Sequence, residues 1–337
     1  MKIEQNIDLA PYNSFGVSVT AARYAEVDSA EQAAWLFAQP EITTSQWMPL
    51  GNGCNVLFTG DYNGTIVRVS DTSILLESED EQSATLRVGG GVEWDDMVEW
   101  CVNHNLWGVE NLSLIPGTVG ACPVQNIGAY GAEAADTIIG VVIWDVNEGR
   151  VRELSPEECN FGYRESVFKH ELKGRALVLA VRFRLSKSAN PRLDYGDVRA
   201  KVEALGGPTL RNIRTAIVEI RRAKLPDHKK VGNAGSFFKN PVVEASVAER
   251  IKAEWPDAPT YPAAEQGKVK LAAGWLIDKC GWKGGRLGRA GVHDRQALVL
   301  INLGGATAQE VITLAETIRK DVASKFGVDI SPEVNIV

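Results

Sequence analysis

The chain has 337 residues, of which 45% are hydrophobic and 23% are charged, and its formal net charge is −7. This length predicts two or three domains, and the composition is typical of a soluble globular protein rather than a disordered one. Because no run of Lys and Arg is long enough to follow a phosphate backbone, we do not expect nucleic acid as a partner. The apolar runs have the length of strands, well below the roughly 20 residues that a membrane-spanning helix needs.

The cysteines and the N-terminal residues predict a cytoplasmic protein without a metal site. The five cysteines are scattered along the chain, and neither a CxxC pair nor an HExxH motif occurs. Free thiols in a reducing compartment are therefore expected. The first residues, MKIEQNIDLAPYN, include acidic side chains and lack the apolar segment of a signal peptide.

The first half of the chain is predicted to alternate strands with two helices. The segment SAEQAAWLFAQP (29–40) predicts a helix, because Ser29 and Gln32 can form a capping box and Pro40 closes the segment. A second helix is expected in EWDDMVEWCVNHNL (93–106). β-branched or alternating runs predict strands at 21–27, 47–51, 55–58, 64–69, 84–91, 138–146, 149–155 and 176–185, with a hairpin turn at 147–149.

The second half contains the clearer helices. Segment 186–200 is polar and rich in turn residues, which predicts a connecting insertion. Isoleucines at helical spacing predict a helix over 212–224, and WLIDKCG (275–281) is also expected to be helical. A long helix is predicted over 307–327, and SPEVNIV (331–337) predicts a terminal strand. The expected class is α+β with several small sheets.

The predicted long helix has sequence signals at both ends. Thr307 and Glu310 can form a capping box at its start, and Gly327 is a stop signal at its end. Its apolar stripe is expected to face a core.

Two segments are rich in glycine. The first glycine loop is PLGNGCNVLF (49–58), and the second glycine loop is LIPGTVGACPVQNIGAYGAE (114–133). Such loops can present backbone N–H groups to an anion such as a pyrophosphate, but ordinary turns also use glycine, and the spacing leaves both interpretations open. Neither loop has the GxGxxG or GxxxxGK[ST] pattern, so neither the Rossmann nor the P-loop mechanism is expected.

A third segment, GNAGSFFKNP (232–241), places Ser236 after three small residues and before two phenylalanines. Small residues let a ligand approach the backbone closely. A nucleophilic serine would need a base, yet this segment contains no histidine and the chain has no G-x-S-x-G elbow. Ser236 is therefore either a structural residue or a general acid, since a carbanion-like centre can take its proton without a base.

These segments together resemble a known family. The two glycine loops are similar to the FAD-binding half of vanillyl-alcohol-oxidase-type flavoproteins. With GYRES (162–166), RRAKLP (221–226), GSFFKNP (235–241), AAGWLID (272–278) and PEV (332–334), the chain resembles the UDP-N-acetylenolpyruvoylglucosamine reductase family, in order and over nearly its whole length.

The resemblance implies an NADPH-dependent flavoenzyme of peptidoglycan precursor synthesis. It would reduce the enolpyruvyl ether of a UDP-sugar to UDP-N-acetylmuramate through non-covalently bound FAD, as a cytoplasmic monomer without membrane or nucleic-acid partners. It also implies an α+β fold in which two subdomains bind FAD and a third binds the substrate. The expected boundaries are 1–69 with 332–337, 70–222 with the insertion at 186–200, and 223–331.

The resemblance also assigns the catalytic residues. Arg164 would hold the carboxylate side of the substrate through paired hydrogen bonds, although spacing alone also fits a surface pair with Glu165. Glu333 would stabilise the enolate, and to do so it should carry or share a proton during turnover. Ser236 would then give a proton to the substrate carbon.

Binding residues follow by motif. Those matched to FAD are Gly51, Asn52, Gly53, Cys54, Asn55, Pro116, Gly117, Thr118, Gly120, Gln125, Asn126, Gly128, Tyr130 and Gly131. Those matched to the nucleotide sugar are Tyr195, Lys224, Asn240, Tyr261, Lys270 and Gln296, and no metal ligand is expected. Tyr195 within 186–200 places the chain in the family's longer type, in which a loop tyrosine folds over UDP. Arg221 fits the diphosphate and a helix-surface charge equally well.

The sequence departs from the family at two thiols. Cys54 stands where a serine is usual, and Cys122 stands at a small-residue position. Neither change removes a backbone donor, so FAD binding is still expected. We take as a hypothesis that both thiols make the site sensitive to oxidation.

Two other functions compete with this interpretation. The chain could be an alcohol or amine oxidase of the same fold, but such enzymes often attach flavin through a histidine, and neither glycine loop contains one. It could also be a nucleotide-sugar-binding protein without catalysis. The joint presence of Arg164, Ser236 and Glu333 disfavours this, because a binding module needs no proton donor.

Overall fold

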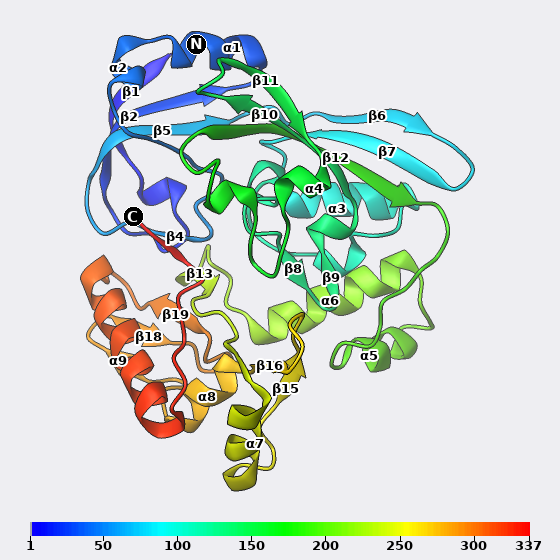
Figure 1. The fold of residues 1–337 in the computed structure, drawn as a ribbon, viewed down its shortest axis with the longest axis vertical. Coiled ribbons are helices and arrows are strands. Elements are labelled where there is room, and N and C mark those ends of the chain that lie inside the picture. Colours follow the sequence, from blue (N-terminus) through cyan, green and yellow to red (C-terminus); the bar gives the residue numbers. More distant parts are fainter. Residues whose placement is uncertain (1) are drawn as a thin grey trace. The chain divides into compact units, whose positions relative to one another are not determined.

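The computed structural model describes residues 2–337, which form two compact units (Figure 1). The first unit contains the residues up to Ile7 together with Ala21–Asn52 and Tyr62–Ala223. The second contains Asp8–Thr20, Gly53–Asp61 and Lys224–Val337. The α+β class is confirmed, because helices accompany several small sheets. The three-domain division stays a prediction.

A four-stranded sheet opens the first unit. Its strand order is β1 (Ile3–Asp8), β2 (Thr20–Val27), β5 (Tyr62–Val69) and β3 (Trp47–Pro49), and β5 runs parallel to both β2 and β3. Helix α1 (Ala30–Phe37) begins as predicted at Ser29, whose hydroxyl accepts the Gln32 N–H at 3.3 Å. Helix α1 ends before Pro40, as predicted, but the second role of Pro40 was not expected. It begins the short helix α2 (Pro40–Thr43), because proline suits a first helical turn.

A five-stranded antiparallel sheet forms the main core of this unit. Its order is β11 (Arg150–Leu154), β10 (Ile138–Asp145), β12 (Ala176–Ser186), β7 (Ser83–Gly89) and β6 (Ile74–Glu79). Helix α3 (Trp94–Asn103) packs against it through Trp94, which is fully buried and lies 6.0 Å from the Phe183 ring in an edge-on contact. The indole N–H donates to the Leu112 carbonyl at 2.9 Å, so burial leaves no polar group unpaired on this side chain.

The remaining elements of the first unit surround the glycine and insertion segments. The hairpin of β8 (Gly128–Ala129) and β9 (Ala132–Glu133) lies within the second glycine loop, and α4 (Pro156–Cys159) follows β11. The predicted insertion is partly helical, since α5 (Val198–Ala204) begins inside it. Helix α6 (Leu210–Lys224) packs its isoleucines against Leu193, Val198 and Val202, as its spacing predicted.

The second unit has its own sheets. Strands β13 (Gly232–Ser236), β19 (Val299–Asn302), β18 (Ala290–Val292) and β17 (Arg286–Leu287) form one sheet in that order. Helix α9 (Ala308–Phe326) contacts β17, β18 and β19, and it has the predicted capping box and glycine stop. Strands β14 (Val242–Glu244), β16 (Lys268–Leu271) and β15 (Thr260–Pro262) form a second sheet, beside α7 (Ala245–Glu254). Helix α8 (Ala273–Lys279) lies against α9.

The C-terminal strand pairs with an early one. Strand β20 (Asn335–Ile336), red in Figure 1, runs parallel to β4 (Val56–Leu57), which comes directly after the first glycine loop's glycines. The Thr59 N–H also donates to the Val337 carbonyl at 2.7 Å. The chain end therefore lies beside the first glycine loop inside the second unit.

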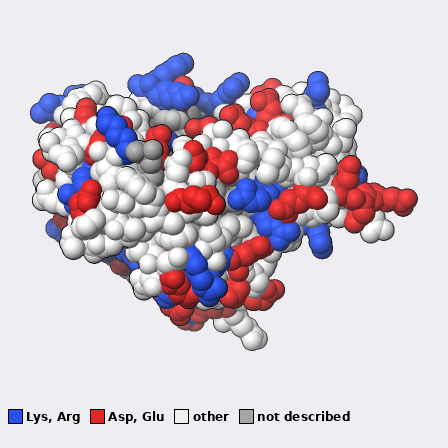
Figure 2. Space-filling view, turned by 90° about the horizontal axis from the view of Figure 1, so that it is seen from above, with Lys and Arg blue, Asp and Glu red and all other residues white. Residues whose placement is uncertain are grey.

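The surface is mixed in charge. Figure 2 shows acidic and basic side chains interspersed over the visible face. Within residues 2–337, no helix combines the length and the apolar character that crossing a bilayer requires. The same residues contain no group of three or more His, Cys, Asp or Glu side chains arranged to hold a metal ion.

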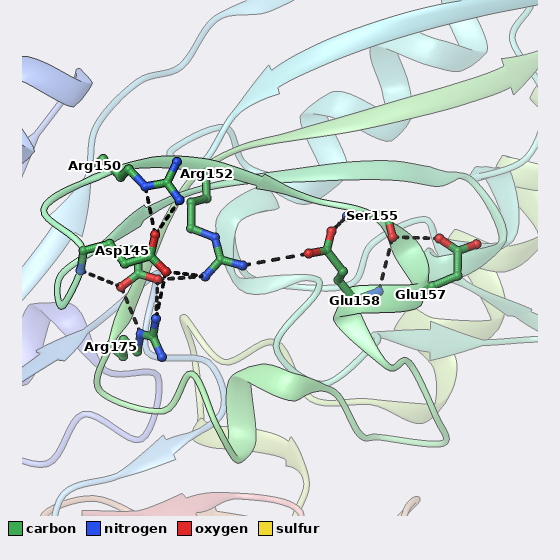
Figure 3. A network of polar contacts seen from close by, with 8 residues as sticks. Asp145, Arg150, Arg152, Ser155, Glu157, Glu158 and Arg175 are labelled. Atoms are coloured by element: carbon green, nitrogen blue, oxygen red, sulfur yellow. Dashed lines mark hydrogen bonds and ion pairs between the residues drawn. The ribbon is translucent and has the colours of Figure 1, made fainter.

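A buried carboxylate organises the β10–β11 turn. Asp145 is fully buried and accepts hydrogen bonds from Arg175 at 2.9 and 2.8 Å and from Arg152 at 3.0 Å (Figure 3). Burial alone would raise the pKa of Asp145, but the hydrogen bonds from Arg175, the Glu148 backbone and Arg152 outweigh it and lower the pKa to about 2. The carboxylate thus fixes the turn between two strands of the main sheet.

We predict that Asp145→Asn lowers the free energy of unfolding of the protein by about 1–2 kcal/mol at pH 7, the scale for hydrogen bonds to charged groups when the partners are partly screened by water. The folded pKa lies below the unfolded value of about 3.9, so this contribution is present above pH ~4 and is lost as pH falls toward 2. Urea unfolding at several pH values measures it.

Glu157→Gln is the matched control, because Glu157 lies at the exposed end of the same region, where it accepts the Ser155 hydroxyl at 2.7 Å (Figure 3). Its unfolding midpoint should stay at the wild-type value. A destabilisation of Asp145→Asn that does not shrink between pH 4 and pH 2 would contradict the role given to the charge.

Candidate active site

The two glycine loops meet within the first unit at Gly51. A Cβ on Gly51 would lie 2.7 Å from the Thr118 hydroxyl of the second loop, so only glycine permits this approach. The second loop in turn packs on the segment after β7, since the Gly120 N–H donates to the Gly90 carbonyl at 2.9 Å. A Cβ on Gly120 would lie 2.9 Å from the same oxygen. Gly51 thus meets the Thr118 side chain, and Gly120 meets the Gly90 backbone, with no side chain of either glycine between them.

Asn52, between the glycines of the first loop, is held on both sides. Its amide donates to Glu93 at 2.6 Å and accepts from Arg68 at 3.2 Å. Arg68 is carried by β5 and Glu93 precedes α3, so both main sheets of the first unit contribute to the position of this loop. Sequence reasoning assigned Asn52 to the cofactor and missed its two partners.

Gly53 makes a second close approach, within the second unit. Its φ is +59°, and a Cβ there would lie 2.1 Å from the Tyr12 carbonyl oxygen. Ser14 connects this residue to the serine segment: its hydroxyl donates to the Asn233 carbonyl at 2.6 Å, and its N–H donates to the Gly53 carbonyl at 3.1 Å. Ser14 is 8% exposed and lies in no motif, so the sequence offered no signal for it.

Arg164 contacts the second glycine loop directly. It sits at a tight turn with φ +56°, in which Gly162 and Glu165 exchange backbone hydrogen bonds. The guanidinium donates to the Gly128 carbonyl at 2.7 Å, and a Cβ on Gly128 would lie 3.1 Å from the same group. The carboxylate of Glu165 lies 3.1 Å from the His170 imidazole. A predicted catalytic residue and a predicted cofactor residue therefore lie side by side.

The rest of the second glycine loop is fixed by internal hydrogen bonds. The Asn126 amide donates to Glu133 at 2.7 Å and to the Gly162 carbonyl at 3.1 Å, which connects this loop to the Arg164 turn. Tyr130 has φ +50°. Burial raises the pKa of its phenol, which also forms a hydrogen bond with Arg221. Pro116 is exposed and Gln125 is half-buried in the same loop.

Ser236 ends a strand that contains a bulge. Strand β13 pairs with β19 at Asn233 and again at Ser236, with a register shift between them where Gly235 has φ +70°. Bulges re-aim side chains, and only glycine adopts this φ without strain. The two following phenylalanines are each 1% exposed, so the half-buried serine is followed directly by buried apolar side chains.

Glu333 lies opposite this segment. The Glu333 N–H donates to the Phe237 carbonyl at 2.7 Å, and Phe238 pairs with Pro332 in an antiparallel bridge. The Asn55 amide donates to the Glu333 carbonyl at 3.3 Å. The second unit thus gathers Ser236, Glu333 and part of the first glycine loop, although they are far apart in the sequence.

The predicted substrate residues fall into three groups. The Asn240 side-chain oxygen accepts the Ala273 N–H at 3.0 Å. The side-chain amide oxygen of Gln296 would lie 3.0 Å from a Cβ on Gly274, so both residues lie at the start of α8. Tyr261 and Lys270 are cross-strand partners of β15 and β16. Lys224 is exposed at the end of α6, and Tyr195 is 45% exposed in the first unit.

The two thiols differ in environment. Cys122 is 1% exposed, and burial raises its pKa well above the usual range. A buried, protonated thiol reacts slowly, which argues against the oxidation hypothesis for Cys122. Cys54 is half-buried in the first glycine loop.

The glycine loops fit a dinucleotide cofactor such as FAD. A Cβ on Gly51 would collide with the Thr118 hydroxyl, and a Cβ on Gly117 or Gly131 would meet no other part of the described chain within 4 Å. Such loops can face a pyrophosphate with N–H groups rather than side chains.

Comparisons with known proteins agree with this site. Residues 21–155 match an FAD binding domain, and residues 226–337 match the UDP-N-acetylenolpyruvoylglucosamine reductase, C-terminal domain. The reductases of that name from Chromobacterium violaceum and Bacteroides fragilis are 49% and 46% identical to this chain, over 99% of it and 98% and 100% of their own lengths.

Solved structures show the same fold. The UDP-N-acetylenolpyruvylglucosamine reductase of Thermus caldophilus superposes with a TM-score of 0.70 at 24% identity, covering 100% of this chain and 99% of that one. The 6-hydroxy-D-nicotine oxidase of Arthrobacter nicotinovorans superposes with a TM-score of 0.52 at 12% identity, covering 97% and 86%. The identities to the curated relatives establish that this chain belongs to the UDP-N-acetylenolpyruvoylglucosamine reductase family.

Proposed function

We propose that this protein reduces UDP-N-acetylglucosamine enolpyruvate to UDP-N-acetylmuramate with NADPH, through bound FAD. Membership of the reductase family supports the substrate and the reaction. The single structural observation that carries the catalytic part is the pairing of the Glu333 segment with the segment that follows Ser236. This pairing holds the Glu333 backbone beside the residue that follows Ser236, and the Glu333 carbonyl also accepts a hydrogen bond from Asn55 of the first glycine loop.

The residues that would hold FAD are those of the two glycine loops. The close approaches at Gly51 and Gly53 support this assignment, because neither glycine adds a side chain to the loop surface. When bound, FAD would supply the hydride chemistry that connects NADPH to the alkene carbon β to the substrate carboxylate.

The protein's own task is to manage charge and one proton. Hydride addition leaves an enolate on the carboxylate side of the substrate. Arg164, a permanent cation fixed at a strained turn, is proposed to hold that carboxylate. Glu333 is proposed to stabilise the enolate by a hydrogen bond. Ser236 then donates its proton to the adjacent carbon, and solvent restores it.

The nucleotide is proposed to be bound by the side chains that the motifs matched to it. Asn240 and Gln296 at the start of α8 would contact the uridine diphosphate, and Lys224 would neutralise phosphate charge. Tyr261 and Lys270 would line the substrate region, and Tyr195 would cover UDP. The cytoplasmic location and the monomeric state stay predictions.

Ser236→Ala tests the proton donor. We predict that NADPH still bleaches the flavin of this variant at the wild-type rate, because hydride transfer to the flavin needs no substrate proton. Reoxidation by the enolpyruvyl sugar should slow at least ~100-fold, the scale for loss of a general acid. Stopped-flow absorbance measures the two half-reactions separately.

Ser331→Ala is the matched control, because Ser331 is exposed and contacts Lys239 of the same paired segments through its backbone carbonyl. Both half-reactions of this variant should match the wild type. Equal slowing of both half-reactions in Ser236→Ala would mean that the serine positions ligands and donates no proton.

The attachment of the flavin gives an independent prediction. Since neither glycine loop contains a histidine to which flavin could be attached, acid precipitation should leave a colourless pellet and a yellow supernatant. Absorbance of the two fractions is the measurement. A yellow pellet would instead favour an oxidase-like covalent flavoprotein.

A further inference from the structure

The loop that carries Tyr195 is held at its base by the second glycine loop. We define the tyrosine loop as residues 186–200. The Arg192 guanidinium donates to the Gly131 carbonyl at 3.2 Å and pairs with Asp136. The Tyr195 ring lies 5.7 Å from the Tyr130 ring in an edge-on contact at 82°. All of these residues belong to the first unit, so their arrangement is internal to it.

Asn111 joins the two loops through one buried amide. The side chain is 2% exposed, and its NH2 group donates to the Tyr130 carbonyl at 2.8 Å and to the Arg192 carbonyl at 2.8 Å. Its own carbonyl oxygen is buried and has no hydrogen-bond partner among the described residues. Burying an unpaired oxygen is unfavourable, so packing alone does not favour asparagine at this position. What the side chain contributes is a fixed distance between two carbonyls, one in each loop.

Tyr130 is held from several directions. Its φ of +50° is uncommon for a residue with a side chain and persists only where neighbours determine it. Arg221 of α6 hydrogen-bonds the phenol and also donates to the Leu114 carbonyl at 3.2 Å, at the start of the second glycine loop. Together with Asn111 and Tyr195, these contacts make Tyr130 the residue through which a shift of the tyrosine loop reaches the proposed flavin site.

The end of the tyrosine loop is more exposed than its base. Leu193 is 7% exposed and packs in the α5–α6 cluster, which fixes the base. Beyond it, Tyr195 is 45% exposed, and Gly196 has φ +55° with no part of the described chain within 4 Å of a Cβ placed there. Motion of Tyr195 would therefore change its contact with Tyr130, whereas the base of the loop stays in place.

We infer that Asn111 is a positioning residue that couples nucleotide binding to the flavin. Asn111 holds Tyr130 and Arg192 at a fixed separation. When Tyr195 closes over UDP, the second glycine loop is therefore stabilised as well, and with it the bound FAD. The inference rests on the proposed role of Tyr195 as the cover of UDP. Because such coupling is reciprocal, UDP must strengthen FAD binding by the same factor by which FAD strengthens UDP binding, and we expect slower FAD release as its sign.

Release of FAD from the holoenzyme, with and without UDP, tests this coupling through flavin fluorescence. In the wild type we expect UDP to slow release about tenfold, within the usual range of coupling between sites. Asn111→Leu keeps a similar volume but donates no hydrogen bond. In this variant we expect the rate of FAD release with UDP to lie within about twofold of the rate without UDP. A residue with a structural role alone would change release with and without UDP by the same factor.

Asn212→Leu is the matched control, since the Asn212 amide also donates to two carbonyls, those of Leu205 and Gly207 at 3.0 and 2.8 Å, away from the tyrosine loop. Its UDP effect should equal that of the wild type. If Asn111→Leu does not retain FAD, Arg192→Ala is the second variant, because it removes the guanidinium contact with Asp136 at an exposed position. This variant should reduce the effect of UDP on the rate of FAD release severalfold.

The outcomes separate the inference from the function on which it rests. An undiminished UDP effect in both Asn111→Leu and Arg192→Ala would overturn the coupling role. UDP that binds the wild type by calorimetry without altering FAD release would overturn the coupling and leave the nucleotide site intact. Absence of UDP binding by the wild type would overturn the nucleotide site, and the coupling with it.

Discussion

The structure depends on two places where a glycine approaches a neighbouring segment with no room for a side chain of its own. Gly51 approaches Thr118, and Gly53 approaches the Tyr12 carbonyl, at distances that a Cβ would occupy. The neighbouring elements hold the residue between these two glycines in place. Arg68 of β5 and Glu93 at the start of α3 both form hydrogen bonds with Asn52. A flavin-binding surface made of backbone N–H groups requires this kind of close packing, because side chains would separate the loops from the phosphates.

Residues outside the recognised motifs hold the motifs in position. Ser14 connects Gly53 to the strand that ends at Ser236, and the terminal segment connects Glu333 to both Phe237 and Asn55. In the first unit, Asn126 connects the second glycine loop to the Arg164 turn, and Asn111 connects it to the tyrosine loop. Single buried amides and hydroxyls thus join segments that the chain order separates. Positioning of this kind is what a reaction with strict geometric demands requires.

The sequence predicted best what depends on neighbouring residues. The capping box and glycine stop of α9, the helical spacing of α6 and the turn after β10 are local signals, and each was confirmed. Pro40 follows α1 as predicted, but its place at the start of α2 was missed, since the same residue can follow one helix and begin another. Ser14 and Asn111 could not be found, because their roles arise from contacts over long sequence separations and neither lies in a motif. Family resemblance supplied the glycine-loop and catalytic assignments, which spacing alone left open.

Anaerobic titration of the purified protein tests the central claim, that the glycine loops hold an FAD through which NADPH reduces the enolpyruvyl sugar. The account predicts a yellow protein whose visible absorbance is bleached by one equivalent of NADPH and restored by one equivalent of the sugar, with the muramate product formed in the same amount. Two results would contradict it: a protein that retains no flavin even after incubation with saturating FAD, or a bleached flavin whose absorbance the sugar does not restore.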